Sequence, residues 1–367
     1  MAFPIAPVPR PGILDLAPYV GGEARIAGVE HPIRLASNES ALGPSPTAMA
    51  AYLALASEIH RYPEGSAEVM REAIGRRHGL DPARIVCGAG SDELIALLLR
   101  SYAGPGDEVL HSRHGFLIYS IGAMSVGATP VAAPERTLTA DVDALLERVT
   151  ARTRLVFIAN PNNPTGTYLG VEELARLHAG IPPSVVLAID AAYAEFVNRN
   201  DYEPGIGLVD RADNVVMLRT FSKIYALAGL RLGWAYCPPA IADVLNRVRG
   251  PFNVSTPALA AGVAAVEDTA SLARARAHND RWLPWFSGRL AALGLALTPS
   301  VGNFVLPRFP DEPGRDAGAA FGFLQAHGIL TRKMGGYGLP QHLRITIGTG
   351  EEMKKVTAVL GEFMARR

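Results

Sequence analysis

The chain has 367 residues, of which 49% are hydrophobic, and its 35 lysine and arginine residues balance its 35 aspartate and glutamate residues. This neutral balance argues against nucleic acid, a polyanion or an anionic membrane as the main partner. With two cysteines, no signal pattern at its start and no apolar run long enough to span a bilayer, the sequence predicts a soluble, cytoplasmic protein without a disulfide framework.

The first part of the chain predicts an arm followed by a large α/β domain. Residues 1–35 are rich in proline, and we expect them to form an extended arm. From about residue 80, apolar runs alternate with helical segments: we expect strands at 84–90, 106–112, 129–134, 153–159, 185–190 and 214–220, and helices at 91–104, 114–128, 141–150 and 171–180. The runs are continuously apolar, which is typical of parallel strands covered by helices on both faces. Residues 36–250 are therefore predicted to form one α/β domain with a mostly parallel central sheet.

The pattern changes after residue 250. A long helical stretch at 273–294 precedes three short candidate strands, at 302–309, 327–333 and 343–350, and residues 351–367 close the chain as a helix. This order predicts a smaller α+β domain over residues 251–367, against which we expect the N-terminal arm to pack.

Polar residues follow several of the predicted strands, at the sheet edge where open α/β sheets bind ligands. GAGSDE (88–93) opens a helix with small residues, so its N–H groups suit a phosphate. An ordinary tight turn and a dinucleotide site, whose third glycine is missing here, remain alternatives for this stretch. NPNNPTG (160–166) follows another strand and presents asparagine amides, although a plain polar turn fits this composition equally well.

Two further strand ends carry an acid and a lysine. Asp190 ends an apolar run, so it either caps a turn or faces a cation such as a protonated ring nitrogen, with Tyr193 nearby as a hydroxyl donor. Lys223 is either a solvated loop residue or a partly desolvated amine of lowered pKa that can form a Schiff base. Arg231 is a fixed cation suited to phosphate. Together these groups fit a phosphate, a phenolic oxygen, a protonated pyridine and an aldehyde, which are the parts of pyridoxal 5′-phosphate.

The order of these motifs resembles that of a known family. NPNNPTG, then D-x-x-Y, then S-K with an arginine eight residues after the lysine, resembles the fold-type I, pyridoxal-phosphate-dependent aminotransferases of classes I and II. Other stretches are similar to the histidinol-phosphate aminotransferase family in particular: LASNESALGP (35–44), HRYPEGS (60–66), GAGSDELI (88–95), SKIYALAGLRLGW (222–234) and LRITIGT (343–349). Two stretches depart from the family pattern: Ala191 replaces the glutamate of D-E-A-Y, and HGFLIYS replaces T-Y-G-x-Y.

The resemblance implies roles for individual residues. Lys223 would form the Schiff base with the cofactor, and Asp190 would pair with its pyridinium nitrogen. The other implied cofactor contacts are Asn163 and Tyr193 at the ring oxygen, Phe116 stacked on the ring, Ser91, Asp92, Ser222 and Arg231 at the phosphate, and Thr220. The implied substrate contacts are Arg344, for the α-carboxylate of glutamate, with Tyr19, Asn38 and Arg332. Tyr62 would reach across a homodimer interface to the phosphate in the partner subunit.

The activity that the resemblance implies is ping-pong transamination between L-histidinol phosphate and 2-oxoglutarate. An aromatic amino acid aminotransferase and a threonine-phosphate decarboxylase on the same scaffold are alternatives. So are a cofactor-binding regulator without turnover and a nucleotide-binding module, which GAGSDE alone supports. No metal site is expected, because His111 and His114 lack a second pair of ligands.

Overall fold

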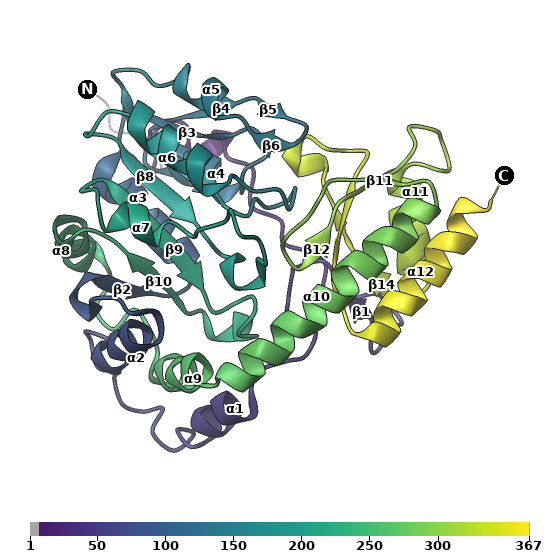
Figure 1. Cartoon of the computed structure of the whole chain (residues 1–367), viewed down its shortest axis with the longest axis horizontal. Helices are drawn as coiled ribbons and strands as arrows, with labels where there is room; N and C mark the ends of the chain where they lie inside the picture. Colours follow the sequence, from purple (N-terminus) through teal and green to yellow (C-terminus); the bar gives the residue numbers. More distant parts are fainter. Residues whose placement is uncertain (1–6, 367) are drawn as a thin grey trace.

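The computed structural model describes residues 7–366, and a seven-stranded sheet forms the centre of its larger part (Figure 1). In sheet order the strands are β2 (Ile85–Gly88), β10 (Gly233–Tyr236), β9 (Val215–Thr220), β8 (Val186–Asp190), β7 (Thr153–Ala159), β3 (Glu108–Ser112) and β4 (Thr129–Ala133). The pairs from β9 to β4 are parallel, whereas β10 runs antiparallel to both of its neighbours. The predicted α/β fold with a mostly parallel sheet is therefore confirmed. We did not expect β10, because its four residues follow a turn-rich segment.

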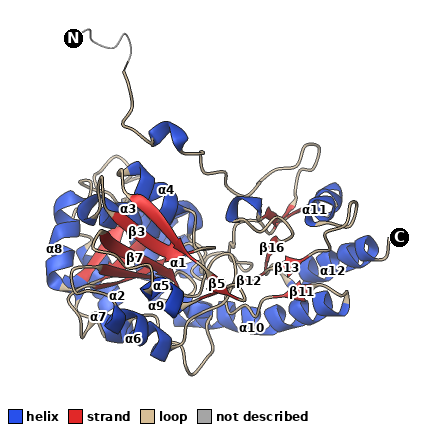
Figure 2. Ribbon diagram, turned by 90° about the horizontal axis from the view of Figure 1, so that it is seen from above, coloured by secondary structure: helices blue, strands red, loops and turns tan. Residues whose placement is uncertain are grey.

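Helices cover both faces of this sheet (Figure 2). One face packs against α3 (Ser91–Tyr102), α4 (Ile118–Ser125) and α8 (Pro239–Val248). The other face packs against α2 (Glu68–His78), α5 (Val142–Leu146), α6 (Val171–Gly180), α7 (Ile206–Val209) and α9 (Thr256–Glu267). Along β8, Val186 and Ala188 join the first core, and Leu187 and Ile189 join the second. Every position of such a strand meets a helix layer, which explains the continuous apolar runs.

The smaller part of the molecule has a separate core built from the C-terminal segments. Its helices are α10 (Thr269–Ala292), α11 (Ala317–Ala326) and α12 (Gly350–Met364). Its short strands are β11 (Ala296–Leu297) with β13 (Pro307–Arg308), and β12 (Phe304–Val305), β16 (Leu343–Thr346) and β15 (Arg332–Lys333) in one sheet. β1 (Ile33–Arg34) pairs in parallel with β14 (Ile329–Leu330), so the segment before residue 36 adds a strand to this part.

The remaining elements are short or connect the two parts. They are α1 (Pro46–Leu53), β5 (Glu135–Arg136), β6 (Thr139–Ala140) and five 3₁₀ turns: η1 (Ile13–Asp15), η2 (Pro82–Arg84), η3 (Ala194–Phe196), η4 (Ala228–Leu230) and η5 (Gly335–Tyr337). Within residues 7–366, no helix combines the length and the apolar character that crossing a membrane requires.

The domain boundaries at residues 35 and 250 remain predictions, and the packing suggests a change to the second. Helix α9 lies against α1 and α2, and its buried residues belong to the core of the sheet-containing part. We therefore propose that the smaller domain begins near α10, at Thr269, rather than at residue 251. Residues 1–6 of the N-terminal arm lie outside the described part. The described arm runs along the outside of the molecule in Figure 2, where Arg10 donates to the carbonyl oxygen of Ser125 at the end of α4 and Arg332 donates to that of Val20.

A buried ion pair connects the turn that follows β8 to the neighbouring strand β9. Glu195 lies in η3, which follows β8, and Arg219 lies near the end of β9. The guanidinium Nη2 of Arg219 is 2.7 Å from Oε1 of Glu195, and each side chain is only 5% exposed. Since both charges are shielded from water, each depends on the other for compensation.

Removing one partner of this pair should destabilise the protein strongly. We expect Arg219→Met to lower the free energy of unfolding by about 3–5 kcal/mol, because it leaves the Glu195 carboxylate buried and unpaired. Chemical unfolding followed by circular dichroism measures this change. Arg247→Met is the matched control, since its ion pair with Asp243 is exposed, and it should change the free energy of unfolding far less. Equal losses for the two variants would contradict the interpretation.

Candidate active site

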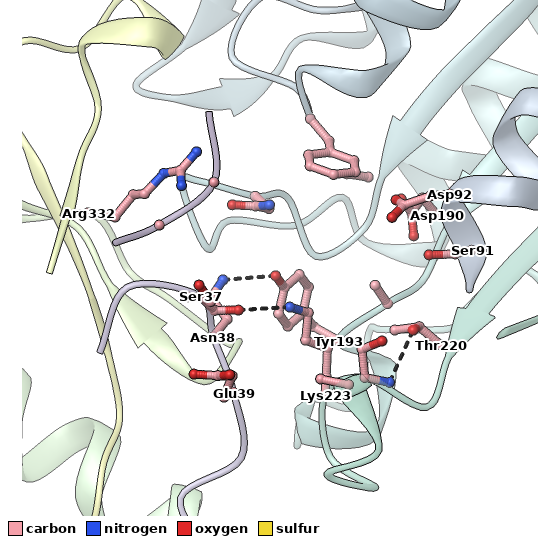
Figure 3. A pocket seen from close by; sticks show the side chains of 18 of the residues that line it. Ser37, Asn38, Glu39, Ser91, Asp92, Asp190, Tyr193, Thr220, Lys223 and Arg332 are labelled. Carbon is pink, nitrogen blue, oxygen red and sulfur yellow. Dashed lines mark hydrogen bonds between the residues drawn. The ribbon is translucent and has the colours of Figure 1, made fainter. Parts of the chain in front are cut away.

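A cavity of about 290 Å³ lies at the carboxyl ends of the central strands (Figure 3). Its walls come from the larger part, from the smaller part and from the N-terminal arm. Every residue that the sequence suggested for the site lines this cavity except Tyr62: Tyr19, Asn38, Ser91, Asp92, Phe116, Asn163, Asp190, Tyr193, Thr220, Ser222, Lys223, Arg231, Arg332 and Arg344. The fold therefore brings together side chains that are up to 325 positions apart along the chain, Tyr19 and Arg344 being the extremes (344 − 19 = 325).

One end of the cavity is built to hold an anion. Helix α3 begins at Ser91, directly after Gly90, whose φ of 83° a residue with a side chain rarely adopts. A Cβ at position 90 would also overlap the guanidinium of Arg231. Arg231 lies 3.1 Å from Asp92 through Nη2 and donates to the hydroxyl of Ser222 through Nη1 at 3.2 Å. Free N–H groups at the start of α3 and a fixed guanidinium thus converge on the same end.

Asp190 is a buried carboxylate with one oxygen bonded and one free. It is 5% exposed at the end of β8, and its Oδ2 accepts a hydrogen bond of 2.8 Å from the hydroxyl of Tyr119. Its Oδ1 is buried and has no hydrogen-bond partner among residues 7–366. Burial raises the pKa of Asp190 to about 6, against the opposing effect of the Tyr119 hydrogen bond. A cationic N–H group from a ligand would satisfy this free oxygen and favour the ionised form.

Lys223 follows β9 and is half-buried in the floor of the cavity. Its Nζ donates to the carbonyl oxygen of Ser37 at 3.0 Å and lies 5.7 Å from the centre of the Tyr193 ring. Burial lowers the pKa of Lys223 to about 8, and the nearby positive charge of Arg344 acts in the same direction. A larger fraction of the amine is therefore neutral, and nucleophilic, near neutral pH than for a solvated lysine.

Asn163 and Tyr193 lie between these groups and are held by partners from distant segments. The amide nitrogen of Asn38 donates to the hydroxyl of Tyr193 at 2.8 Å, so the phenolic hydrogen is free to be donated to another group. Burial raises the pKa of Tyr193, which keeps that hydrogen in place. Arg344 donates to the side-chain oxygen of Asn163, and this contact leaves the amide hydrogens of Asn163 available.

The opposite end of the cavity concentrates positive charge. Arg332 and Arg344 are direct cross-strand partners on β15 and β16, and both line the cavity. Like charges at such positions repel each other. Burial lowers the pKa of Arg344, and its Nε has no partner among the described residues. An anionic ligand would relieve both costs. Tyr19 lies under the guanidinium of Arg332 at 5.6 Å and meets Phe116 edge to face at 6.4 Å, which gives this end an aromatic wall.

Tyr62 is the expected site residue that lies elsewhere. It is 82% exposed and stacks on Phe252, with the ring centres 4.8 Å apart. Within one chain it does not line the cavity, so its expected role rests on a second copy of the chain.

The structure also places residues in the site that the sequence did not indicate. Ser37 and Glu39 line the cavity, and Tyr119 holds Asp190 from behind. Asn38, which lies between Ser37 and Glu39, and Phe116, three residues before Tyr119, are among the predicted residues. However, nothing in the sequence indicates that Tyr119, a tyrosine inside an apolar helix, contacts Asp190. Among the described residues no group of three His, Cys, Asp or Glu side chains is placed to hold a metal ion.

Comparisons with known proteins give a consistent result. The model for the family described as aminotransferase class I and II matches residues 30–360. The chain is 64% identical over 98% of its length to the histidinol-phosphate aminotransferase of Paramagnetospirillum magneticum and covers 99% of that protein. For the protein of the same name from Rhodospirillum centenum the identity is 62%, with 98% and 99% of the two chains covered. A solved histidinol-phosphate aminotransferase from Sinorhizobium meliloti, in complex with pyridoxal-5′-phosphate, superposes with a TM-score of 0.88 at 30% identity, covering 99% of this chain and 98% of that one.

The raised pKa of Asp190 predicts a pH-dependent cost in the ligand-free chain. Between its usual value of 3.8 and about 6 the folded state holds a proton that the unfolded state has lost. Stability therefore falls as pH rises through this window, and the full cost persists above it. Asp190→Asn should raise the free energy of unfolding of the ligand-free chain by about 3 kcal/mol near pH 7, and this gain should vanish below about pH 4.

Chemical unfolding of ligand-free wild type and variant across this pH range measures the difference. Asp243→Asn, which removes an exposed carboxylate on α8, is the control for replacing any aspartate by asparagine. A gain from Asp190→Asn that does not change with pH would show that the carboxylate is not destabilised in the folded state.

Proposed function

The chain belongs to the aminotransferases of class I and II, and we propose that it is the histidinol-phosphate aminotransferase of histidine biosynthesis. It would transfer the amino group of L-histidinol phosphate to 2-oxoglutarate and so release imidazole-acetol phosphate and L-glutamate. The observation that carries the proposal is the 64% identity to a protein of that name over nearly the whole of both chains. The arrangement of charges in the cavity supports it independently.

Pyridoxal 5′-phosphate is the cofactor of this enzyme, and the residues of the cavity fit it. Its phosphate matches the start of α3 with Arg231, and its ring nitrogen matches the free Oδ1 of Asp190. Its ring oxygen matches the free donors of Asn163 and Tyr193. When bound, the cofactor supplies an aldehyde that condenses with amines and a cationic ring that withdraws electrons from the neighbouring carbon.

The residues of the chain would orient this group and manage protons around it. Asp190 would hold the proton of the ring nitrogen through Oδ1, and Tyr193 would donate its phenolic hydrogen to the ring oxygen. The Lys223 amine would condense with the aldehyde carbon, whose oxygen leaves as water. Once the donor's amine has displaced it, Nζ of Lys223 would take the proton from the donor carbon that bears the amine and deliver it to the former aldehyde carbon. The lowered pKa of this amine suits both tasks near neutral pH.

The two arginines suit the anionic groups of both substrates. Glutamate carries an α-carboxylate, whereas histidinol phosphate carries a phosphorylated hydroxymethyl group (CH₂–O–phosphate) at that position. Guanidinium groups pair with either anion through two parallel hydrogen bonds. We propose that Arg344 binds the carboxylate and that Arg332, with Tyr19 and Asn38 beside it, contributes to binding the phosphate.

A panel of amino donors tests this proposal. Purified holoenzyme with 2-oxoglutarate should show its highest kcat/KM with histidinol phosphate. Tyrosine and phenylalanine should react more slowly, by a factor of about 100 or more, because their α-carboxylate can pair with Arg344 but they leave Arg332 without a phosphate. We expect a low activity with these donors, because the rings of Tyr19 and Phe116 form an aromatic wall in the cavity. Equal or higher efficiency with tyrosine would favour the aromatic aminotransferase alternative, and carbon dioxide release from threonine phosphate would favour the decarboxylase.

Lys223→Ala is the control for the covalent chemistry in that panel. Borohydride reduction of the wild-type holoenzyme followed by peptide mapping should find the cofactor on Lys223. The variant should give no such adduct and lose transamination by about 10⁴-fold or more. A labelled peptide elsewhere in the chain would refute the role of this lysine.

We also propose that the enzyme is a homodimer in which Tyr62 contacts the cofactor phosphate of the partner subunit. Tyr62 stacks on Phe252, and both rings are exposed, so a second copy of the chain could cover them. Leu53, Ile59 and Val69, which are near Tyr62 in the sequence, are exposed as well. A cytoplasmic location, expected from the sequence, remains a prediction.

Mixed dimers test the sharing of sites. Tyr62→Ala and Lys223→Ala chains, co-expressed with different affinity tags, should each be nearly inactive alone. In a mixed dimer one site has both Lys223 and a partner tyrosine, so random mixing should restore about a quarter of wild-type activity. Absence of any recovery in purified mixed dimers would place the action of Tyr62 within its own subunit.

A further inference from the structure

Tyr119 makes a contact that the proposed catalytic roles leave unexplained. It lies in α4 and is completely buried, yet its hydroxyl reaches the carboxylate of Asp190 and donates to Oδ2 at 2.8 Å. Asp190 thus has one oxygen bonded on the side away from the cavity, while Oδ1 is left without a partner among the described residues. The hydrogen bond therefore selects which oxygen remains for a ligand.

Packing fixes the ring of Tyr119 in this position. It stacks on Phe157 of β7 with the ring centres 4.8 Å apart and the planes 9° apart. It also meets Phe116 edge to face at 5.9 Å. The hydroxyl of the next residue, Ser120, is hydrogen-bonded to Nε2 of His111 on β3 at 2.8 Å, which connects this turn of α4 to the sheet. A phenol enclosed in this way has little freedom to choose another acceptor.

We propose that Tyr119 is a positioning residue for the cofactor: by holding Oδ2 of Asp190, it directs Oδ1 at the pyridine nitrogen and keeps the carboxylate ionised. This inference rests on the proposed function, and it assigns Tyr119 no contact with the cofactor itself. Phe116 would then contact the face of the cofactor ring, and Tyr119, three residues later, would act on the ring nitrogen through Asp190.

The charges around the pair are consistent with this role. Burial raises the pKa of Asp190 to about 6, and the hydrogen bond from Tyr119 acts against that rise. Burial also raises the pKa of Tyr119 itself, so the phenol keeps the hydrogen that it donates. Other titratable groups face the pair from each neighbouring segment: Asp92 on α3, Lys223 after β9, Tyr193 after β8, His111 on β3 and Tyr337 in η5. The charge of Asp92 raises the pKa of Asp190, and the charge of Lys223 lowers it. Because the hydrogen bond from Tyr119 also lowers the pKa of Asp190, losing that bond would raise this pKa further.

Tyr119→Phe tests the proposal, because it removes the hydroxyl and keeps the stacked ring. The measurement is the dissociation constant of the cofactor, obtained by absorbance or fluorescence titration of enzyme from which the cofactor has been removed. Two probes are compared: pyridoxal 5′-phosphate and the analogue in which a carbon atom replaces the ring nitrogen. We expect the variant to bind pyridoxal 5′-phosphate about tenfold more weakly, whereas its affinity for the analogue should stay near that of wild type. Equal losses for both probes, or no loss for either, would overturn the proposal.

The pH profile gives a second readout that a purely structural role would not move. Affinity for pyridoxal 5′-phosphate should decline in wild type as pH falls through the pKa of Asp190, about 6, because the carboxylate is neutralised. In Tyr119→Phe this decline should begin at higher pH, since the carboxylate has lost a donor. An unshifted profile would count against the proposal.

Tyr236→Phe is the matched control. Its phenol also donates to a carboxylate, that of Asp210, at 2.7 Å, and Tyr236 is buried in β10 outside the cavity. The control should leave the cofactor affinity unchanged. In an Asp190→Asn background, Tyr119→Phe should add little further loss, because the charge that it supports is gone.

Two outcomes keep this inference separate from the proposed function. If the wild-type enzyme binds the cofactor at Lys223 and transaminates while Tyr119→Phe matches it in both titrations, only this inference fails. If wild type takes up no cofactor, the proposed function itself fails.

Should Tyr119→Phe not fold, 3-fluorotyrosine placed at position 119 keeps the ring and makes the phenol a stronger donor. The decline in affinity should then begin at lower pH than in wild type, and an unchanged profile would overturn the proposal.

Discussion

The site depends on a carboxylate that the fold keeps away from water. Asp190 ends a strand that is covered on both faces, so its charge is costly unless a cation or hydrogen-bond donors meet it. Tyr119 donates to one oxygen of Asp190, and the other has no hydrogen-bond partner within residues 7–366 and so remains for a ligand. The cationic form of a pyridine ring is stabilised by this arrangement, and that form is the one that acts as an electron sink. The buried charge is therefore a cost to the empty chain and a benefit to the complex.

The other end of the cavity has the opposite imbalance. Arg332 and Arg344 face each other across two strands, and Arg344 helps to keep the pKa of the nearby lysine low. Repulsion among these cations favours anionic substrates, and it also favours the neutral form of Lys223 that attacks a carbonyl carbon. Binding and nucleophilicity thus draw on the same electrostatic environment. The cavity thus presents the carboxylate of Asp190 to a cationic ring nitrogen, and Arg332 and Arg344 to an anionic group, which gives a bound molecule a defined direction.

Several segments that are far apart in the sequence must pack together correctly for this electrostatic environment to exist. The segment that contains Asn38 runs between the two parts of the molecule, and it contacts Tyr193 on one side and Thr346 of β16 on the other. Arg344 reaches from the smaller part to Asn163 in the larger one. The Glu195–Arg219 pair joins the loop that carries Tyr193 to the strand that leads to Lys223. The cavity is therefore a property of how the two parts are packed together, and small displacements between them would separate its groups.

The sequence by itself determined the sheet and the main chemical groups of the site. Continuous apolar runs specify strands buried on both faces, and parallel strands place their carboxyl ends at one edge, so the sequence pattern alone assigns Asp190, Asn163 and Lys223 to one place. The chemistry of a fixed cation made Arg231 a candidate for phosphate, and the resemblance added Arg344. Only the tertiary structure revealed β10, which runs against its neighbours, and the packing of α9 with the larger part, because neither a short strand's direction nor a helix's partner is encoded in local periodicity. The same reason applies to Tyr119: a tyrosine in an apolar helix looks like any core residue until the acceptor that it reaches, 71 positions away, is brought next to it.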